Sequence, residues 1–308
     1  MNSKINVAVL LGGVSSERNI SLISGAKVVE NIPVNKYDVT KYDLKDQLTE
    51  FINDVTNKKI DVVFPVLHGK FGEDGTVQGL LELLQIPYVG CNVLTSSLCM
   101  DKAITKKMVA YHNILTPEFN VFSNFEEINI NQITLPCVVK PTDAGSSVGT
   151  SIPETKQELI SGIKNAFSES QQIIIEEYIK GREFTVGIIG NRNQTVFPIT
   201  EIKANISKFY DYKAKYENGG STHICPAQID SKLAEQLKSL SKKIFNIVGA
   251  RGVSRIDFMV SEDNTPYFIE VNTMPGMTGT SLLPEMASKI NISFAQLLDK
   301  LIQLAFEK

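Results

Sequence analysis

The stretch YFIEVNTMPGMTGTSLLP, residues 267–284, opens as a short apolar run that Glu270 and Asn272 interrupt. Upstream, GVSRIDFMV is another apolar run, interrupted in the same way by Arg255 and Asp257. Side chains alternate between the two faces of a β-strand, so each polar pair lies on one face of its own strand. The pattern predicts two strands that each carry two polar groups on a single face.

The segment SEDNTP between these two runs is typical of a hairpin connection. Asp263 and Asn264 suit a two-residue turn because Asp and Asn tolerate positive φ, and Pro266 fits near the start of the second strand. This turn predicts two cross-strand pairs, Asp257 with Glu270 and Arg255 with Asn272.

One face of the hairpin would then hold two carboxylates, an amide and a guanidinium. Two carboxylates opposite one another repel, so a positive group is expected between them. Magnesium that is bound to nucleotide phosphates prefers such hard oxygen ligands. The alternative is a charged sheet face exposed to solvent, and the spacing favours the metal site.

Length and composition are those of an ordinary globular protein. The 308 residues suffice for two or three domains with a sizeable core, and 43% apolar with 21% charged residues is typical of such domains. The net charge of −3 gives no general reason to expect nucleic acid or an anionic membrane as a partner. No apolar run approaches the roughly 18 residues of a membrane span.

The cysteines and the N-terminal segment indicate a cytoplasmic protein. The four cysteines contain no CxxC pair, which favours buried cytosolic thiols over disulfides or zinc. The segment INVAVLL is short and lacks a small-residue cleavage site, so we expect a strand and not a signal peptide.

The first third of the chain alternates between strand and helix. Strands are expected over INVAVLL, IDVVFPVLHG and IPYVG, and helices from about Arg18 to Glu30 and over TVQGLLELLQ. This βαβ alternation predicts a mostly parallel sheet and a first domain that ends near residue 96.

The remaining chain mixes helices with short strands. Helices are expected over DKAITKKMVAYHN, TKQELISGIKNAFSES and KLAEQLKSLSKKIFNIVG, with two more at the end of the chain. Strands are expected over EFNVF, LPCVVKP, QQIIIEEYIKG, EFTVGIIGN and TVFPITEI. Residues 203–227 have no clear period, and so long an irregular stretch in a compact enzyme is usually a functional loop or lid.

Two lysines stand out by their positions. Lys140 ends an apolar strand, and the glycine- and serine-rich loop after it can turn backbone N–H groups and hydroxyls toward phosphate. That loop contains Gly145, Ser146, Ser147 and Gly149. It does not end in GK[ST], so it is not a Walker A loop, and a plain hairpin connection is the alternative. Lys102 begins a helix, where a cation opposes the dipole, so either a function or a surface position explains it.

Several carboxylates and a histidine are further candidates. The segment QQIIIEEYIKGREF contains Glu176, Glu177 and Glu183. These carboxylates suit an adenine edge and ribose hydroxyls, or a solvated strand end. His68 lies at the C-terminal end of a strand, where open α/β sheets bind ligands, unless it is a structural loop residue. Glu17 lies in the first turn of a helix that Ser15 or Ser16 can cap, and it complements the dipole there with or without a ligand.

Six motifs together resemble the D-alanine–D-alanine ligase family: GGVSSERNISL, HGKFGEDGTVQG, VVKPTDAGSSVGTS, FYDYKAKY, SRIDFMV and IEVNTMPGMTGTSLLP. They occur in the family order and span almost the whole chain, with Leu11 as a departure where the family often has histidine. The resemblance implies an α/β protein with a three-domain ATP-grasp fold, in which an N-terminal parallel α/β domain precedes central and C-terminal α+β domains that clasp ATP. The implied domains are residues 1–96, 97–181 and 182–308, with a lid loop at 203–227.

The resemblance also implies residue roles, position by position. The implied magnesium ligands are Asp257, Glu270 and Asn272. The implied nucleotide contacts are Lys102, Lys140, Ser146, Ser147, Glu176, Glu177, Tyr178, Ile179, Glu183, Lys215, Phe258 and Glu270. The implied D-alanine contacts are Glu17, His68, Arg255, Gly276, Ser281 and Leu282. The implied catalytic set is Glu17, Ser146, Tyr212, Lys215, Tyr216, Arg255, Gly276 and Ser281.

The activity implied by this family is ATP-dependent joining of two D-alanines through an acylphosphate, for peptidoglycan precursor synthesis. ATP and two Mg²⁺ ions, with Mn²⁺ as a substitute, are the implied cofactors. We expect small-molecule substrates, a homodimer, and neither nucleic acid nor membrane as a partner. One alternative is a ligase that joins D-alanine to D-lactate or D-serine, against which Glu17 and Tyr216 favour the dipeptide. Another is a nucleotide-binding regulator, which would have no need for Arg255.

Overall fold

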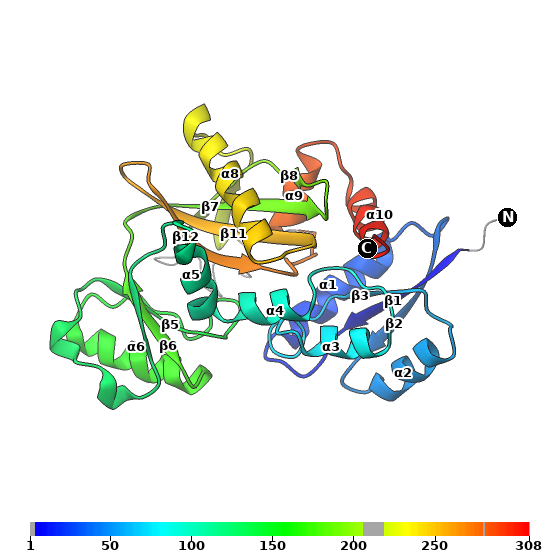
Figure 1. Cartoon of the computed structure of the whole chain (residues 1–308), viewed down its shortest axis with the longest axis horizontal. Coiled ribbons are helices and arrows are strands. Elements are labelled where there is room, and N and C mark those ends of the chain that lie inside the picture. Colours follow the sequence, from blue (N-terminus) through cyan, green and yellow to red (C-terminus); the bar gives the residue numbers. More distant parts are fainter. Residues whose placement is uncertain (1–3, 206–218, 280, 308) are drawn as a thin grey trace.

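The computed structural model describes residues 4–205, 219–279 and 281–307. These residues form three β-sheets with helices packed around them, as Figure 1 shows. The N-terminal sheet and the small sheet with β5 and β6 lie at opposite ends of the molecule in that view, and the largest sheet lies between and above them. The predicted α/β architecture is confirmed.

The N-terminal sheet is parallel and has the strand order β2–β1–β3. Its strands are β1 (Ile5–Leu11), β2 (Tyr37–Asp43) and β3 (Val62–Pro65), and its helices are α1 (Arg18–Asn31), α2 (Leu48–Thr56) and α3 (Thr76–Leu83). The predicted βαβ alternation is confirmed, although β2 and α2 were not anticipated. IPYVG, expected as a strand, contributes only an isolated bridge between Val63 and Tyr88, since Pro87 has no N–H to donate to a ladder.

A small antiparallel sheet follows, with the order β4–β6–β5. The chain reaches it through α4 (Val93–Met100) and α5 (Lys102–Tyr111). Its elements are β4 (Phe119–Phe122), two 3₁₀ turns (Phe125–Glu127 and Ile130–Gln132), β5 (Cys137–Pro141), α6 (Lys156–Glu169) and β6 (Ile173–Glu177). Thr155 and Glu158 form a capping box at the start of α6, whose buried face packs on the sheet.

The largest sheet has six strands among the described residues, in the order β10–β9–β7–β11–β12, with β8 paired to β7. The strands are β7 (Gly181–Gly190), β8 (Thr195–Val196), β9 (Thr200–Ala204), β10 (Ser221–Ile224), β11 (Gly252–Ser261) and β12 (Pro266–Asn272). The helices are α8 (Ser231–Ile247), α9 (Leu282–Ser288) and α10 (Phe294–Ala305).

Two strand predictions in this part of the chain were wrong. TVFPITEI forms β8 and β9 in place of one strand, because Pro198 within it cannot donate a ladder hydrogen bond. The irregular stretch 203–227 contains the end of β9 and all of β10, which pair in register from Glu201 with Ile224 to Ala204 with Ser221. This short edge strand has no apolar alternation, so only its pairing with β9 reveals it.

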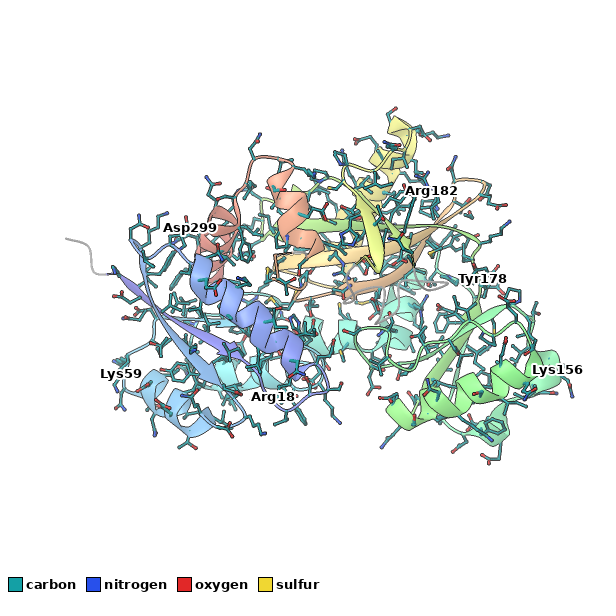
Figure 2. All side chains as sticks on the ribbon, turned by 180° about the vertical axis from the view of Figure 1, so that it is seen from behind. Arg18, Lys59, Lys156, Tyr178, Arg182 and Asp299 are labelled. Atoms are coloured by element: carbon teal, nitrogen blue, oxygen red, sulfur yellow. The ribbon has the colours of Figure 1, made fainter. Side chains whose placement is uncertain are left out.

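Helix α10, near the C-terminal end of the sequence, packs against the N-terminal sheet. One hydrophobic core contains β1, β3 and α1 together with α9, α10 and parts of β7 and β11. Asp299 of α10, labelled in Figure 2, accepts hydrogen bonds from the Lys36 ammonium at 2.7 Å and the Tyr37 hydroxyl at 2.6 Å. The first sheet is therefore stabilised by residues from the C-terminal end of the sequence.

Other expectations concern the thiols and membrane segments. Cys91, Cys99 and Cys137 are buried thiols, as predicted, and Cys225 is partly buried. Among the residues that the structure describes, no helix combines the length and the apolar character needed to cross a bilayer.

Candidate active site

The β11–β12 hairpin has the predicted pairs at its polar end: Asp257 lies opposite Glu270, and Arg255 lies opposite Asn272. The predicted two-residue turn is wrong, because a hydrogen bond from the Ser261 N–H to the Thr265 carbonyl closes a loop of three residues, 262–264. Asn264 alone of the expected turn residues has positive φ, at +64°. Pro266 is the first residue of β12, as predicted.

A β-bulge in the same hairpin compensates for the longer turn. The register shifts between Asp257 and Phe258, so that Phe258 pairs with Phe268 and Ile269 is the extra residue of β12. A bulge breaks strict alternation and turns consecutive side chains toward one face. Ile269 and Glu270 accordingly both line the cleft on this side of the sheet.

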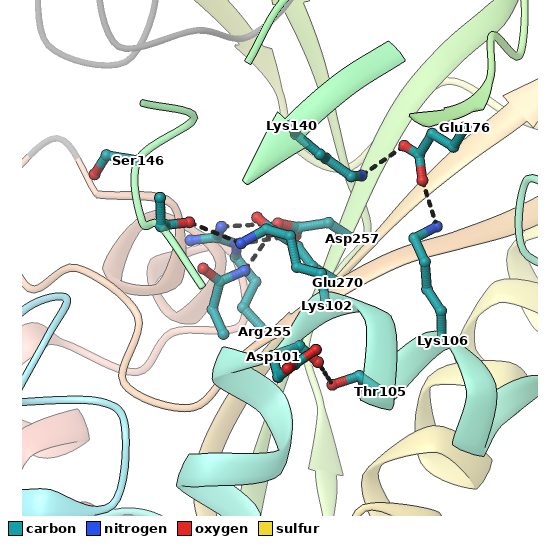
Figure 3. A network of polar contacts seen from close by, with 12 residues as sticks. Asp101, Lys102, Thr105, Lys106, Lys140, Ser146, Glu176, Arg255, Asp257 and Glu270 are labelled. Atoms are coloured by element: carbon teal, nitrogen blue, oxygen red, sulfur yellow. Dashed lines mark hydrogen bonds and ion pairs between the residues drawn. The ribbon is translucent and has the colours of Figure 1, made fainter. Parts of the chain in front are cut away.

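The polar face of the hairpin is closely connected, as Figure 3 shows. The Arg255 guanidinium donates two hydrogen bonds to Asp257, at 3.0 and 2.8 Å, and the Asn272 amide donates to the same carboxylate at 2.9 Å. The Lys102 ammonium lies 3.6 Å from Glu270 and donates to the Ala144 carbonyl at 2.8 Å. Both carboxylates thus have cationic partners, as like charges across a strand pair require.

This donor set fits a divalent cation that is shared with a ligand. Asp257, Glu270 and Asn272 offer carboxylate and amide oxygens, which are the ligands that magnesium prefers. The described part of the chain contains no group of three or more His, Cys, Asp or Glu side chains placed to bind a metal ion. A cation here would therefore take its remaining ligands from bound phosphate or water.

A cleft of about 520 Å³ lies between the small and the large sheet. Its walls include most of the predicted nucleotide contacts, namely Lys102, Lys140, Ser147, Glu176, Glu177, Tyr178, Ile179, Glu183 and Glu270, together with the predicted magnesium ligand Asp257. Tyr178 and Arg182 are seen in Figure 2 where the chain passes from the small sheet to the large one. The linker between the sheets therefore forms one wall of the cleft.

Phe258 was predicted to contact the nucleotide, and its position in the structure contradicts this prediction. Its side chain is fully buried in the core beneath α8, because it points to the opposite face of β11 from Asp257 and Met259. The apolar residues that do line this cleft include Met259 and Ile269, which sequence reasoning missed. Alternation from Asp257 could have indicated Met259, whereas Ile269 faces the cleft only because of the bulge.

Lys140 and Glu176 contact each other across neighbouring strands. The Lys140 ammonium donates to Glu176 at 2.5 Å, and the second carboxylate oxygen of Glu176 lies 2.9 Å from the Lys106 ammonium (Figure 3). Glu176 is 4% exposed. Burial raises the pKa of Glu176, but the two ammonium groups outweigh it and hold that pKa below its usual range.

A second cleft, of about 150 Å³, adjoins the first. It is lined by the predicted residues Glu17, His68, Lys102, Ser146, Arg255, Glu270, Asn272, Gly276, Ser281 and Leu282. Lys102 and Glu270 belong to both clefts. The two spaces therefore meet at the pair formed by the start of α5 and the end of β12.

Glu17 forms a bridge between the N-terminal sheet and the loop after β5. The Ser146 hydroxyl donates a hydrogen bond to the buried Glu17 carboxylate. Gly69 and Gly145 pass close to this carboxylate, and a Cβ atom on either residue would collide with it. Glu17 is the N-cap residue of α1 and does not cap it through its side chain. Its carboxylate is therefore directed into the cleft and not along the helix.

The predicted caps of α1 were wrong. Ser15 donates its hydroxyl hydrogen bond to the His68 carbonyl at 2.7 Å and accepts one from the Glu17 N–H at 3.2 Å. Ser15 thus joins the loop before α1 to the loop after β3. This contact depends on two loops meeting in space, which helix-capping rules do not consider.

Glu73 is a further residue of this cleft that sequence reasoning missed. It accepts a hydrogen bond from the Gly69 N–H at 2.7 Å and lies 4.0 Å from His68. Burial and the nearby Glu17 carboxylate raise the pKa of Glu73 to about 8, and burial lowers the pKa of His68 to about 4. Burial thus disfavours the charged forms of both Glu73 and His68 in this cleft. The motif HGKFGEDG contains Glu73 and was the available signal.

The backbone of the glycine- and serine-rich loop is suited to anion binding. Ser146 and Ser147 have φ of +50° and +58°, in the left-handed region that non-glycine residues rarely adopt. Ser146 lines the smaller cleft and Ser147 the larger one. The predicted residues Tyr212, Lys215 and Tyr216 lie outside the described residues.

Two family models match the chain: "D-ala D-ala ligase C-terminus" over residues 103–303 and "D-ala D-ala ligase N-terminus" over residues 43–91. The D-alanine–D-alanine ligase B of Clostridium perfringens (strain 13 / Type A) is 39% identical over 307 residues, covering 99% of this chain and 99% of that protein.

Solved structures agree with these matches. The D-alanine–D-alanine ligase from Bacillus anthracis complexed with ATP is 35% identical with a TM-score of 0.85, covering 98% of this chain and 97% of that one. The VanG D-Ala:D-Ser ligase from Enterococcus faecalis is also 35% identical, with a TM-score of 0.83, covering 98% of this chain and 100% of that one.

Proposed function

The chain belongs to the D-alanine–D-alanine ligase family, and we propose that it performs its ligation where the two clefts meet, at Lys102 and Glu270. It has the ATP-grasp fold and is an ATP-dependent ligase that joins two D-alanines for peptidoglycan synthesis. The continuity of the clefts is the observation that carries the proposed location. A nucleotide in the larger cleft would bring its terminal phosphate to the smaller one.

In the larger cleft, side chains and backbone of the sheet linker hold the base and ribose of ATP. These residues are Glu176, Glu177, Tyr178, Ile179 and Glu183. Lys102, Lys140 and the Ser146–Ser147 loop neutralise and orient the phosphates through ammonium, hydroxyl and N–H groups.

Asp257, Glu270 and Asn272 would hold Mg²⁺, as two ions, with Mn²⁺ as a substitute. When bound, the metal supplies positive charge that offsets the repulsion between the phosphates and an attacking anion. The oxygen-only donor set supports this assignment.

In the smaller cleft, Glu17 holds the ammonium of the first D-alanine, and His68 lies beside its carboxylate. Arg255 and the backbone at Gly276 stabilise developing negative charge, and Ser281 with Leu282 receive the carboxylate of the second D-alanine. All six residues line this one cleft, which supports their assignment to the two amino acids.

The reaction then proceeds in two displacements. The first carboxylate attacks the γ-phosphorus of ATP, so a C–O–P bond forms and ADP leaves. The amine of the second D-alanine attacks the acylphosphate carbonyl and gives a tetrahedral oxyanion beside Arg255. Inorganic phosphate leaves, the amine nitrogen releases one proton and keeps the other, and the amide remains. No side chain becomes covalently attached.

Water would hydrolyse the acylphosphate, so the site must exclude it. We assign this function to the segment 203–227, with Tyr212, Lys215 and Tyr216 outside the described residues. We further propose the domains 1–96, 97–181 and 182–308, a homodimer and a cytoplasmic location. The three separate sheets support the domain division.

Release of inorganic phosphate tests the function directly. With MgATP, D-alanine should give equimolar phosphate and dipeptide, and neither should form without the amino acid. D-serine and D-lactate are tested as second substrates, because the D-Ala:D-Ser ligase is 35% identical to this chain, the same identity as the ATP complex of the Bacillus anthracis ligase. Faster coupling to D-serine or D-lactate would favour the alternative ligase, and nucleotide binding without turnover would indicate a regulator.

A further inference from the structure

Helix α5 carries two buried or half-buried lysines one turn apart, and the function above uses only the first. Lys106 lies one turn after Lys102 on the same side of the helix, and its side chain is 0% exposed. The Lys106 ammonium lies 2.9 Å from Glu176, donates to the Thr116 hydroxyl at 2.6 Å, and faces the Phe119 ring at 5.7 Å. Figure 3 shows Lys106 on the opposite side of Glu176 from Lys140.

A fully buried ammonium is costly, because it loses its hydration. Burial lowers the pKa of Lys106 to about 8, against the opposing attraction of Glu176. An apolar side chain of similar length would avoid that cost and fill the same space. We therefore ask which role of the Lys106 charge, beyond packing, would offset this cost.

Lys106 does not line either cleft. Its partner Glu176 lines the nucleotide cleft, and so does Lys140, the other lysine that contacts Glu176. Any effect of Lys106 on a nucleotide must therefore pass through Glu176. The carboxylate divides its two oxygens between the lysines, with Lys140 at 2.5 Å on one and Lys106 at 2.9 Å on the other.

This division matters because Lys140 has two competing anionic partners. In the structure its ammonium contacts Glu176, and in the proposed function it contacts phosphate. If Lys140 were the sole counter-ion of Glu176, its departure would leave a buried carboxylate uncompensated, which is strongly unfavourable. A second ammonium that stays in place removes that obstacle.

We propose that Lys106 is a positioning residue for nucleotide binding: it is the permanent counter-ion of Glu176 and so allows Lys140 to turn to the phosphates of ATP. The proposal rests on the proposed function in assigning Lys140 to phosphate. The contact of Lys106 with the Thr116 hydroxyl supports a fixed position for this lysine, because that hydroxyl in turn donates a hydrogen bond to the Phe268 carbonyl of β12 at 3.0 Å. Lys106 therefore connects Glu176 of the small sheet to the strand that carries Glu270.

The test is a double-mutant cycle on binding of a non-hydrolysable ATP analogue with Mg²⁺, measured by calorimetry. Lys106→Met keeps the side-chain length and removes the charge. We expect its Kd to rise about tenfold, as for loss of a buried charge-assisted contact, with KM for D-alanine and kcat at saturating ATP unchanged within about twofold. Lys107→Met on the exposed side of the same helix is the matched control and should leave the Kd unaltered.

The second half of the cycle separates positioning from mere structural support. In a Glu176→Gln background there is no carboxylate to compensate, so adding Lys106→Met should change the Kd by less than about twofold. An equal rise in both backgrounds would overturn the proposal, because Lys106 would then act through Thr116 and the helix. If Lys106→Met does not fold, Lys106→Gln keeps a donor for Thr116 and gives the same comparison. An inactive but ATP-binding parent protein would refute the proposed function and leave this cycle measurable.

Discussion

Single charged side chains in the site are held in place by opposite charges and not by packing alone. Arg255 contacts Asp257, and Lys102 lies 3.6 Å from Glu270 where the clefts join. A change that removes one charge but keeps the shape should therefore alter chemistry much more than folding. Glu270 and Glu17 are the side chains that test this expectation.

Glu270→Gln keeps the size of the side chain and removes an anionic ligand from the proposed magnesium site. We expect turnover to fall by at least about a hundredfold, since catalytic charge stabilisation of this kind is worth several kcal/mol. The melting temperature should stay close to that of the parent. Phosphate release and thermal unfolding measure the two quantities, and near-normal turnover by the folded variant would sink the metal assignment.

Glu17→Gln tests whether the carboxylate binds substrate or only complements the dipole of α1. Loss of a dipole complement would cost roughly 0.3–1 kcal/mol of stability and leave kinetics alone. Loss of a charged substrate contact, worth roughly 1.5–3 kcal/mol, should raise the KM of the first D-alanine site about ten- to a hundredfold. We expect the second result, because Glu17 is buried beside Ser146 and makes no cap. A lower melting temperature with unchanged KM would assign Glu17 to structure.

Two elements determine the geometry of the site, the β11–β12 hairpin and helix α5. The hairpin brings together the polar face, and its register depends on a three-residue turn and a bulge that compensate for one another. Helix α5 begins between the clefts and directs Lys102 toward Glu270. Substitutions at the ends of the hairpin and of α5 should therefore affect the positions of site residues that the substituted side chains do not contact.

The hairpin turn depends on Asn264, whose φ is +64°. A β-branched residue there should destabilise the protein by about 1–2 kcal/mol, because the left-handed conformation brings Cβ close to a carbonyl oxygen. Asn264→Gly should be neutral or slightly stabilising, since glycine adopts this conformation without strain. Denaturant unfolding of Asn264→Val and Asn264→Gly measures the difference. Equal stability in the two variants would show that the turn adapts.

Asp101 caps α5 by accepting a hydrogen bond from the Ile104 N–H at 2.9 Å. Asp101→Ala should destabilise the protein by about 0.5–2 kcal/mol and, by loosening the first turn, raise the KM for ATP through Lys102. Asp101→Asn keeps a cap of similar strength and serves as the matched control. An unchanged KM in Asp101→Ala, despite lower stability, would mean that Lys102 does not depend on the cap.

The molecule as a whole depends on α10, which packs against the first sheet and the largest one. Leu301 is 0% exposed in the core that these sheets share, whereas Lys300 beside it is exposed. This arrangement makes the start of the chain dependent on its end.

Leu301→Ala should lower the free energy of unfolding by about 2–5 kcal/mol, the cost of a cavity in a packed core. The site does not include this residue, so KM values should stay near those of the parent. Lys300→Ala is the control and should change stability by less than about 0.5 kcal/mol. A Leu301→Ala protein as stable as this control would show that α10 is dispensable for the shared core.

Much of this protein could be predicted from local patterns in its sequence. Alternation along a strand placed Glu270 with Asn272 and Arg255 with Asp257, and the structure confirms that these pairs face one another. The βαβ alternation of the first third is also confirmed. Such features depend on neighbouring residues and on backbone geometry that repeats every two or about four positions, so the order of residues is sufficient to reveal them.

Other features depend on contacts between residues that are far apart in the chain. The bulge that turns Ile269 to the cleft, the charge pair of Lys106 with Glu176 and the proximity of Glu73 to Glu17 have no local signature. Burial and charge partners depend on which segments pack together, and that is a property of the whole fold. For this reason local patterns identified the family and predicted residues that line the two clefts, whereas the charge partners and the exact facing of those residues required the packed molecule.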